Sequence, residues 1–306
     1  MIHKRTFSDY VIDGVVLLSM FIVLIAVMYP LLNALAISFN HAEDTARGGV
    51  TLWPRVFAYE SYRSVLTNPL IWNAYRITIL RTVIGTITAL FSTSIISYGL
   101  AHANLVGRRT YALICLIPMY FTGGLLPWFM MIRGMGLFNN FWVYIIPVQI
   151  GLFHIILMRT FFQSLPESLE ESAMLDGANY LTIFFKIIVP ISTPIIATIA
   201  LFIGVFHWND WFYGTVFIST RADLRPMQNV LLRVINEARF AEEIAALAGG
   251  GGAVGAAAGA IGRGRPANVR SITMATMFIT LVPVVLVYPF LQRYFIKGIM
   301  VGSIKG

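Results

Sequence analysis

The sequence predicts an all-α membrane protein with six transmembrane helices. Three observations support this prediction: 58% of the 306 residues are hydrophobic, only 12% are charged, and apolar runs of about 20 residues recur along the chain. The mean hydropathy is +0.76, and soluble domains carry about twice this share of charged residues, roughly 25%. A membrane protein is therefore expected, and not a soluble helical domain.

The charge distribution agrees with this fold class. Basic residues outnumber acidic ones, 22 to 14, which gives a net charge of +8. They are scattered and mostly flank the apolar runs, which is typical of membrane topology and not of a phosphate-binding stripe. We therefore expect membrane lipid as a partner and no nucleic acid.

The six spans are placed on the apolar runs in order. The first run follows Lys4 and Arg5 as a signal peptide would, but it is longer than the usual apolar core of roughly 7–15 residues, so we expect an uncleaved helix. We expect residues 1–306 to form a single transmembrane domain. Windows of about 20 apolar residues place the spans near 11–37, 73–100, 111–132, 141–161, 187–208 and 272–293.

The flanks of these spans favour an orientation with both termini inside. All lysines of the chain then lie on the inner side, and all six tryptophans lie on the outer half. A raw count of arginines does not favour this orientation, but most outer arginines lie in two long loops, where the positive-inside rule carries little weight.

A Gly- and Ala-rich segment, residues 248–268, interrupts the last outer loop. Gly251, Gly255 and Gly259 stand four residues apart, which matches a transmembrane packing motif. The run is short and has few large apolar residues, and a seventh span would put the C-terminus outside. Its composition favours a flexible external linker.

The loop after the fourth span, residues 162–190, is unusually acidic for so apolar a chain. Ser164 and Glu167 have the spacing of a capping box, which predicts a short helix over about 165–176. Gly177 can close that helix in the left-handed conformation, and Asn179 can cap a second short helix that leads to the fifth span. We therefore expect a helix-turn-helix at the membrane surface.

One face of the first short helix combines acidic and apolar side chains. Glu171, Met174, Leu175 and Ala178 fall at helical spacing, which suits docking into a groove of a partner protein. The alternative is an amphipathic helix resting on the bilayer. Such helices are usually rich in Lys and Arg, whereas anionic lipid would repel this one.

This loop resembles the EAA loop of bacterial ABC importer permeases, whose pattern is E-A-A, three residues, G, nine residues and I-x-L-P. The spacing is intact, with Ser172 in place of an alanine and Val189 in place of a leucine. Three further stretches, YPLLNALAISFN (29–40), HWND (207–210) and YPFLQRYFIKGIMVGSIKG (288–306), resemble the carbohydrate-uptake group of these inner-membrane components. The matching loop positions are Glu171-Ser172-Ala173, Gly177, Ile187, Val189 and Pro190.

The resemblance implies the type I, MetI-like permease fold, with the EAA loop as a cytoplasmic coupling helix that sits in a cleft of a separate ATPase dimer. Glu171 would pair with a basic group of the ATPase, Ala173 would allow close packing, Gly177 would make the turn, and Asp176 would support it. The ATPase-coupling set that this implies is Glu171, Ala173, Asp176, Gly177, Ile187 and Pro190.

The resemblance also implies the other components of an importer. These are a second, related permease subunit, an extracytoplasmic solute-binding protein and an oligosaccharide substrate, in a multi-pass protein of the bacterial cell membrane. The chain has no phosphate-binding loop of the G-x-x-x-x-G-K-[ST] type. We therefore expect no cofactor, and ATP to be bound by the partner.

Two aromatic groups near the outer side are candidates for the substrate pathway. Aromatic faces beside amides and carboxylates can bind sugar rings; the alternative is an ordinary interfacial aromatic belt. Arg76 and Arg81, in the outer half of the second span, could snorkel outward or line a water-filled cavity. The pathway candidates are Trp208, Asn209 and Asp210, followed by Trp211, and Tyr120, Phe121 and Trp128.

Other function classes fit the sequence less well. A membrane-embedded enzyme needs a catalytic or metal constellation, which lone His154 and Cys115 do not supply, so we expect no catalytic or metal residues. A secondary transporter is expected to carry intramembrane carboxylates near the midplane. The sequence thus predicts a permease subunit for an oligosaccharide that is a breakdown product of a polysaccharide; a permease for a non-sugar solute and a secondary transporter are the alternatives.

Overall fold

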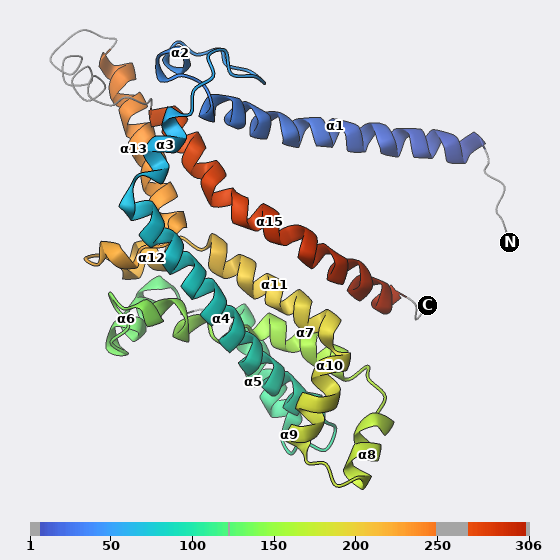
Figure 1. The fold of residues 1–306 in the computed structure, drawn as a ribbon. Coiled ribbons are helices and arrows are strands. Elements are labelled where there is room, and N and C mark those ends of the chain that lie inside the picture. The colour runs from blue at the N-terminus through green and yellow to red at the C-terminus, as the bar shows by residue number, and fades with distance from the viewer. Residues whose placement is uncertain (1–6, 122, 249–268, 304–306) are drawn as a thin grey trace. The chain divides into compact units, whose positions relative to one another are not determined.

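The computed structural model describes residues 7–121, 123–248 and 269–303 (Figure 1). The secondary-structure elements of this part of the chain are helical, and one isolated bridge joins Asn40 to Phe57. The chain divides into two compact units, one made of Met1–Pro69 and Leu231–Leu281 and the other of Leu70–Val230 and Val282–Gly306. The expected single domain stays a prediction. The expected flexible insert, apart from Ala248, lies outside the described residues.

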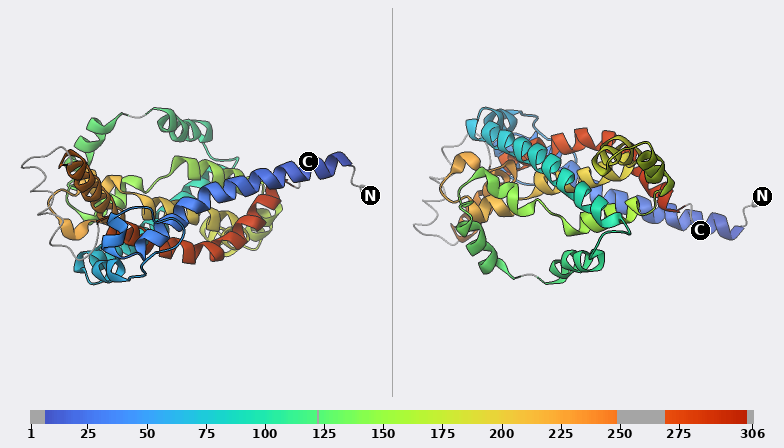
Figure 2. Two further views of the ribbon diagram at one scale, coloured as in Figure 1. Left: turned by 90° about the horizontal axis from the view of Figure 1, so that it is seen from above. Right: turned by 90° about the horizontal axis from the view of Figure 1, so that it is seen from below.

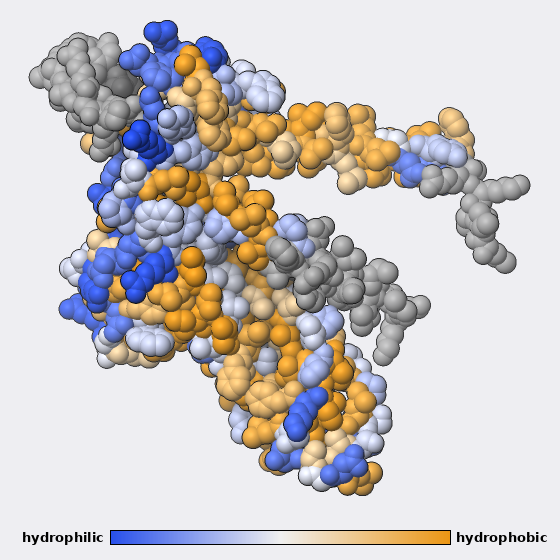
Figure 3. Space-filling model, in the orientation of Figure 1, coloured by the Kyte–Doolittle hydropathy of each residue, from blue (hydrophilic) through white to orange (hydrophobic). Residues whose placement is uncertain are grey.

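The first unit contains a long N-terminal helix and two short ones: α1 (Phe7–Ser38), α2 (Ala42–Ala46) and α3 (Glu60–Leu66). The part of α13 (Met227–Ala248) from Leu231 onward and the part of α15 (Val269–Ser303) up to Leu281 complete it. Figure 2 shows α1, in blue, extending away from α2 and α3. The side chains of α1 are exposed up to Leu32, and the helix becomes buried from Ala34 onward. The exposed part is apolar (Figure 3).

The second unit is a bundle built on α4 (Pro69–Ala101). Figure 1 shows α8 and α9 at one end of this unit and α6 and α12 at the other. Its further helices are α5 (Arg108–Tyr120), α6 (Leu125–Gly134), η1 (Phe141–Tyr144), η2 (Ile146–Val148), α7 (Leu152–Phe162), α8 (Ser168–Leu175), α9 (Tyr180–Ile183), the π-helix η3 (Phe184–Ile188), α10 (Val189–Ile191), α11 (Thr193–Asn209), α12 (Phe212–Phe217) and η4 (Ala222–Leu224).

Three helices are long and apolar enough to cross a membrane by themselves: α1, α4 and the Val269–Pro289 part of α15. Three further candidates are pairs of helices bent by more than 40°: α5 with α6, the segment Phe141–Val148 with α7 at 47°, and the segment Tyr180–Ile191 with α11 at 84°. The described residues therefore hold three unbroken candidate spans, or up to six if each bent pair is one span.

The sequence placed the third, fourth and fifth spans as single ranges, and the structure shows a break within each of them. Gly124, which separates α5 from α6, has φ +84°, where a residue with a side chain is strained. The outer part of the predicted fourth span forms the short 3₁₀ helices η1 and η2. The predicted fifth span, 187–208, is interrupted at Ser192, because Pro194 follows in the first turn of α11 and cannot donate a backbone hydrogen bond there.

Two hydrophobic clusters hold the second unit together. The first cluster joins α4, α7, α8, α9 and α11, and its buried residues include Tyr98, Met158, Ala173, Ile183 and Ile199. The second cluster joins α4, α6, η1 and α12 through Ile77, Ile132, Val143, Tyr144 and Phe217. The acidic loop is therefore attached to the first cluster, and the tryptophan-rich segment after α11 adjoins the second.

Candidate functional site

The acidic loop begins with α8, which starts three residues later than predicted. The expected capping box does not form: Ser164 Oγ donates to the carbonyl of Phe161 at 2.7 Å. That carbonyl belongs to the last turn of α7 and also accepts from the backbone N–H of Ser164 at 2.9 Å, so Ser164 bonds back to α7 and does not cap α8. Glu167 occupies the N-cap position instead, and its carbonyl accepts from the backbone N–H of Glu171 at 3.1 Å.

The turn after α8 has the predicted form. Gly177 has φ +82°, its N–H donates to the carbonyl of Met174 at 2.9 Å, and the N–H of Ala178 donates to the carbonyl of Ala173 at 3.0 Å. These two bonds define a Schellman motif, which satisfies two free carbonyls of the helix end. Asp176, exposed, occupies the C-cap. The predicted cap of the second helix also forms, because Asn179 Oδ1 accepts from the N–H of Thr182 at 2.8 Å.

The exposed residues of α8 include Glu171, Met174 and Leu175, together with Ser168, Leu169 and Ser172. Leu175 is 89% exposed and Met174 is 39% exposed, although both are apolar. Ala178, which the sequence placed on one face with Glu171, lies beyond the Gly177 turn and packs against the first cluster, so that part of the prediction is wrong. Ala173 faces inward and is buried in the same cluster. Close packing at Ala173 therefore occurs within this chain and draws α8 against α7 and α9.

An ion pair fastens α8 to the end of α4. His102 Nε2 lies 2.9 Å from Glu170 Oε2, and His102 Nδ1 lies 2.8 Å from the carbonyl of Tyr98. Both ring nitrogens face acceptors, so the contact is charge-assisted when the imidazole is protonated. Sequence reasoning missed this pair. The available signal was an isolated histidine directly after the second span, at the level where the acidic loop was expected.

The remaining two coupling-loop candidates lie on the helix that leads to α11. Ile187 is half-buried against the first cluster, and Pro190 is exposed in α10. The π-helix η3 precedes Pro190, with the N–H of Val189 bonded to the carbonyl of Phe184. Helices α9, η3 and α10 therefore form one continuous helical segment, Tyr180–Ile191, which meets α11 at 84°.

At the opposite end of the unit, Asp210 forms a buried ion pair with Arg81. Arg81 Nη2 lies 2.7 Å from Asp210 Oδ2, and the two side chains are 1% and 7% exposed. Arg81 Nη1 also donates to the carbonyl of Asp210, and its guanidinium lies 4.3 Å from the centre of the Tyr144 ring. The expectation that Arg81 snorkels or lines a water-filled cavity is therefore wrong. The pair joins α4 to the end of α11, and Asp210 is not presented to a ligand.

The neighbours of Asp210 remain accessible to different degrees. Trp208 is half-buried beside Tyr75, with ring centres 6.5 Å apart, and Asn209 is exposed and accepts from Gln228 at 3.4 Å. Trp211 is 49% exposed. The structure thus separates the predicted group into one structural carboxylate and three polar or aromatic side chains that reach the surface.

The second aromatic group is divided by the break between α5 and α6. Tyr120 and Phe121 lie at the end of α5 and are each 75% exposed, whereas Trp128 lies in α6 and packs against the second cluster. Among the described residues no group of three or more His, Cys, Asp or Glu side chains could hold a metal ion. The exposed apolar, aromatic and acidic side chains at the two ends of the unit are suited to docking and recognition.

Comparisons with known proteins place these features in context. No protein-family model matches the chain. The chain is 36% identical over 305 residues to the polygalacturonan/rhamnogalacturonan transport system permease protein YtcP of Bacillus subtilis (strain 168), covering 99% of this chain and 100% of the relative. It is 34% identical over 277 residues to protein LplC of the same strain, covering 90% and 89% of the two chains.

More distant similarity extends to other sugar systems. The chain is 28% identical over 291 residues to the arabinooligosaccharides transport system permease protein AraQ of Halalkalibacterium halodurans, covering 94% of each chain. Among solved structures it is similar to a chain from the crystal structure of a bacterial ABC transporter involved in the import of the acidic polysaccharide alginate. The TM-score is 0.83 at 29% identity, covering 95% of this chain and 99% of that one.

Proposed function

Because this chain belongs to the permease subunits of carbohydrate ABC importers, we propose that it forms half of the translocation pathway for an oligosaccharide derived from an acidic polysaccharide. Its relatives are integral membrane subunits of transporters and not enzymes. An importer of this kind works with an ATPase and a binding protein. The partners specific to this chain would be an ATPase dimer that binds ATP, a second related permease, and a solute-binding protein that delivers the sugar.

The proposed topology is six spans in one permease domain of the bacterial cytoplasmic membrane, with both termini inside. Three unbroken helices and three bent pairs supply enough candidates for six spans. The acidic loop and the tryptophan-rich segment lie at opposite ends of the second unit. This separation supports a cytoplasmic position for the loop and an outer position for Trp208 and Trp211.

One observation carries the proposal: α8 presents an exposed acidic and apolar face while its other side is fixed to the bundle. Ala173 is buried in the first cluster, Glu170 is paired with His102, and Gly177 sets the direction of the chain into α9. An element that is rigidly attached on one side and exposed on the other is suited to transmit the movement of a docked partner. We assign Glu171, Met174 and Leu175 to contact with the ATPase, by the helix-in-groove mode.

The substrate class is proposed from the relatives together with the surface of the outer end. A relative of the same length is a permease of a polygalacturonan/rhamnogalacturonan transport system. The similar solved structure is that of a transporter involved in the import of alginate. Trp211 and Asn209 offer an aromatic face and an amide near the same end. Since Asp210 is neutralised by Arg81, no free carboxylate at this position would repel a uronate.

The experiment is a reconstitution. The permease would be purified with its neighbouring permease and ATPase gene products, placed in lipid nanodiscs, and supplied with the binding protein and defined oligosaccharides. We expect ATP hydrolysis to be stimulated by oligogalacturonates or related uronate oligomers and to be unchanged by neutral arabino-oligosaccharides. Stimulation by arabino-oligosaccharides alone would reverse the substrate assignment, and stimulation by neither would remove the oligosaccharide proposal.

A further inference from the structure

The loop between α2 and α3, residues 47–59, carries large apolar side chains with high exposure. Trp53 is 81% exposed and Leu52 is 43% exposed, and neither is charged. The loop has no regular secondary structure apart from the bridge between Asn40 and Phe57. Exposed apolar side chains on an irregular segment are costly in water, so their surroundings need an explanation.

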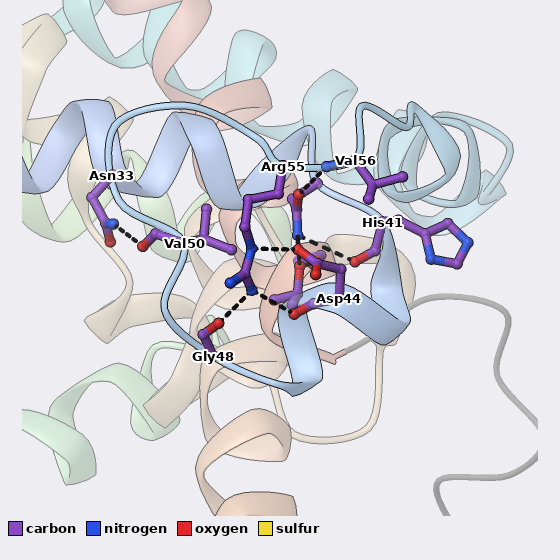
Figure 4. A network of polar contacts seen from close by, with 10 residues as sticks. Asn33, His41, Asp44, Gly48, Val50, Arg55 and Val56 are labelled. Atoms are coloured by element: carbon purple, nitrogen blue, oxygen red, sulfur yellow. Dashed lines mark hydrogen bonds and ion pairs between the residues drawn. The ribbon is translucent and has the colours of Figure 1, made fainter.

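The loop is nevertheless held in one conformation (Figure 4). Arg55 Nε donates to Asp44 Oδ2 at 2.9 Å, and its Nη2 donates to the carbonyls of Asp44 and Gly48. The N–H of Val56 donates to Asn40 Oδ1 at 3.0 Å. Asn40 also donates to Asp44 Oδ2 at 2.9 Å, and this amide, followed by Arg55, holds the pKa of Asp44 below its ordinary value. The segment that carries Trp53 is therefore a fixed projection.

A second contact sets the level of this projection along α1. The side-chain nitrogen of Asn33 donates to the carbonyls of Val50 and Thr51 at 2.8 and 2.7 Å. Asn33 is the first polar residue after the apolar stretch Gly14–Leu32, apart from Ser19, whose hydroxyl is bonded to Val16. That stretch rises about 28 Å, roughly the thickness of the hydrocarbon core. Asn33 thus marks one edge of the core.

We propose that Leu52 and Trp53 insert into the lipid headgroup region beside α1 and anchor the loop to the bilayer surface. Leu52 directly follows the carbonyls that Asn33 holds at the core edge. Backbone carbonyls at that depth need a protein donor, which Asn33 supplies, and Pro54 adds no N–H to satisfy. Tryptophan is the side chain that favours this interface.

Lipid is favoured over a protein partner because the patch continues the lipid-facing surface of α1. Tyr29 and Leu32, four residues and one residue before Asn33, are 51% and 40% exposed and apolar or interfacial in character. The inference requires α1 to cross the membrane, but it is independent of the substrate and of the coupling loop. Under the proposed orientation the anchor lies in the outer leaflet.

Spin labelling of the assembled importer in lipid nanodiscs tests the anchor. In a Cys115→Ala background, single cysteines would replace Trp53, Leu24 in the middle of α1, and exposed Glu43 in α2. Collision rates are measured with oxygen, which concentrates in lipid, and with a water-soluble nickel chelate. We expect oxygen to dominate at positions 24 and 53 and the chelate to dominate at position 43. Adding Asn33→Leu should raise the chelate collision rate at position 53 and leave position 24 unchanged.

Three results would overturn the proposal. In the first, position 53 is as accessible to the chelate as position 43, while position 24 lies in lipid. The loop would then be in water, although α1 crosses the membrane. Protection of position 53 only after addition of the binding protein would make the patch a protein-docking site. A label at position 24 that meets the chelate would remove the span itself, and with it the proposed topology.

Discussion

Arg81 and Asp210 lie 129 residues apart in sequence and form a buried ion pair, with Arg81 Nη2 2.7 Å from Asp210 Oδ2. The backbone N–H of Phe212 also donates to Asp210 Oδ1 at 3.1 Å. The pair therefore fixes where α11 ends and how the chain turns into α12. Because both charges are buried, each depends on the other for its stability in the fold.

Asp210→Ala should destabilise the protein, by roughly 3–5 kcal/mol, because it leaves the Arg81 charge buried without its partner. The measurement is the thermal stability of the detergent-solubilised complex, followed by size-exclusion chromatography. Asp210→Asn, which keeps an acceptor for Phe212, should lose less. The double variant Arg81→Met with Asp210→Leu should be more stable than Asp210→Ala. Normal thermal stability of Asp210→Ala with abolished uptake would contradict the structural role and assign the carboxylate to the substrate.

Gly177→Ala should weaken coupling through the backbone alone. An added Cβ meets nothing within 4 Å, so the cost, of roughly 1–2 kcal/mol, comes from φ +82°. We expect less ATPase to co-purify and substrate-stimulated hydrolysis to fall, and Gly177→Val should be worse because its side chain is branched. The matched control is Gly134→Ala, which also has open space but no positive φ. Equal behaviour of the two alanine variants would mean that the turn geometry is not needed.

Glu171→Ala should abolish substrate-stimulated ATP hydrolysis without lowering the thermal stability of the permease. Glu171 is exposed in this chain, so its removal costs the fold little. If Glu171 forms a desolvated ion pair with a basic group of the ATPase, its removal would weaken the binding of the two subunits by roughly 3–5 kcal/mol. The control is Glu167→Ala, an exposed carboxylate at the start of the same helix, which should keep full stimulation. If both variants couple normally, the assignment of α8 to the ATPase is refuted.

The loop that carries Trp53 should resist mild acid and loosen only in strong acid. The folded pKa of Asp44 is lowered, so the unfolded loop binds the proton more readily than the folded one. The stabilisation is therefore complete above the ordinary value of 3.8 and is lost as the pH falls through the lower, folded value. A spin label at position 53 should gain mobility over that range, with a label at position 24 unaffected. Asp44→Asn should remove the pH dependence; retention of it would place the titrating group elsewhere.

The parts of the coupling loop that the sequence predicted depend on local backbone chemistry. A glycine after an amphipathic helix and an asparagine before the next one act through bonds that span three to five residues, so Gly177 and Asn179 could be recognised without knowledge of the fold. Ala173 is not among these parts, because its close packing was expected against the ATPase and occurs within this chain. The capping box predicted at Ser164 does not form, because its hydroxyl bonds to the preceding carbonyl of Phe161 and not to an N–H of the following helix, and the sequence does not rank these two local partners.

The contacts that the sequence did not predict are tertiary. Arg81 with Asp210 and His102 with Glu170 join residues from different helices, and a sequence shows each charge without showing which helix lies opposite. The apolar runs located the candidate membrane spans but not their breaks. Hydropathy averages over about 20 residues, whereas the break before α6 and the break at Ser192 are each at most 4 residues long.

The near-perpendicular junction at Ser192 has a mechanical consequence. Tyr180–Ile191 is a stiff rod of about 18 Å, and it meets α11 at 84°. If α8 docks to the ATPase and α11 spans the membrane as proposed, a push on the α8–α9 turn along that rod would be directed across the axis of α11. It would displace the near end of α11 sideways and hardly along its own axis, so no polar end of α11 would have to enter the hydrocarbon.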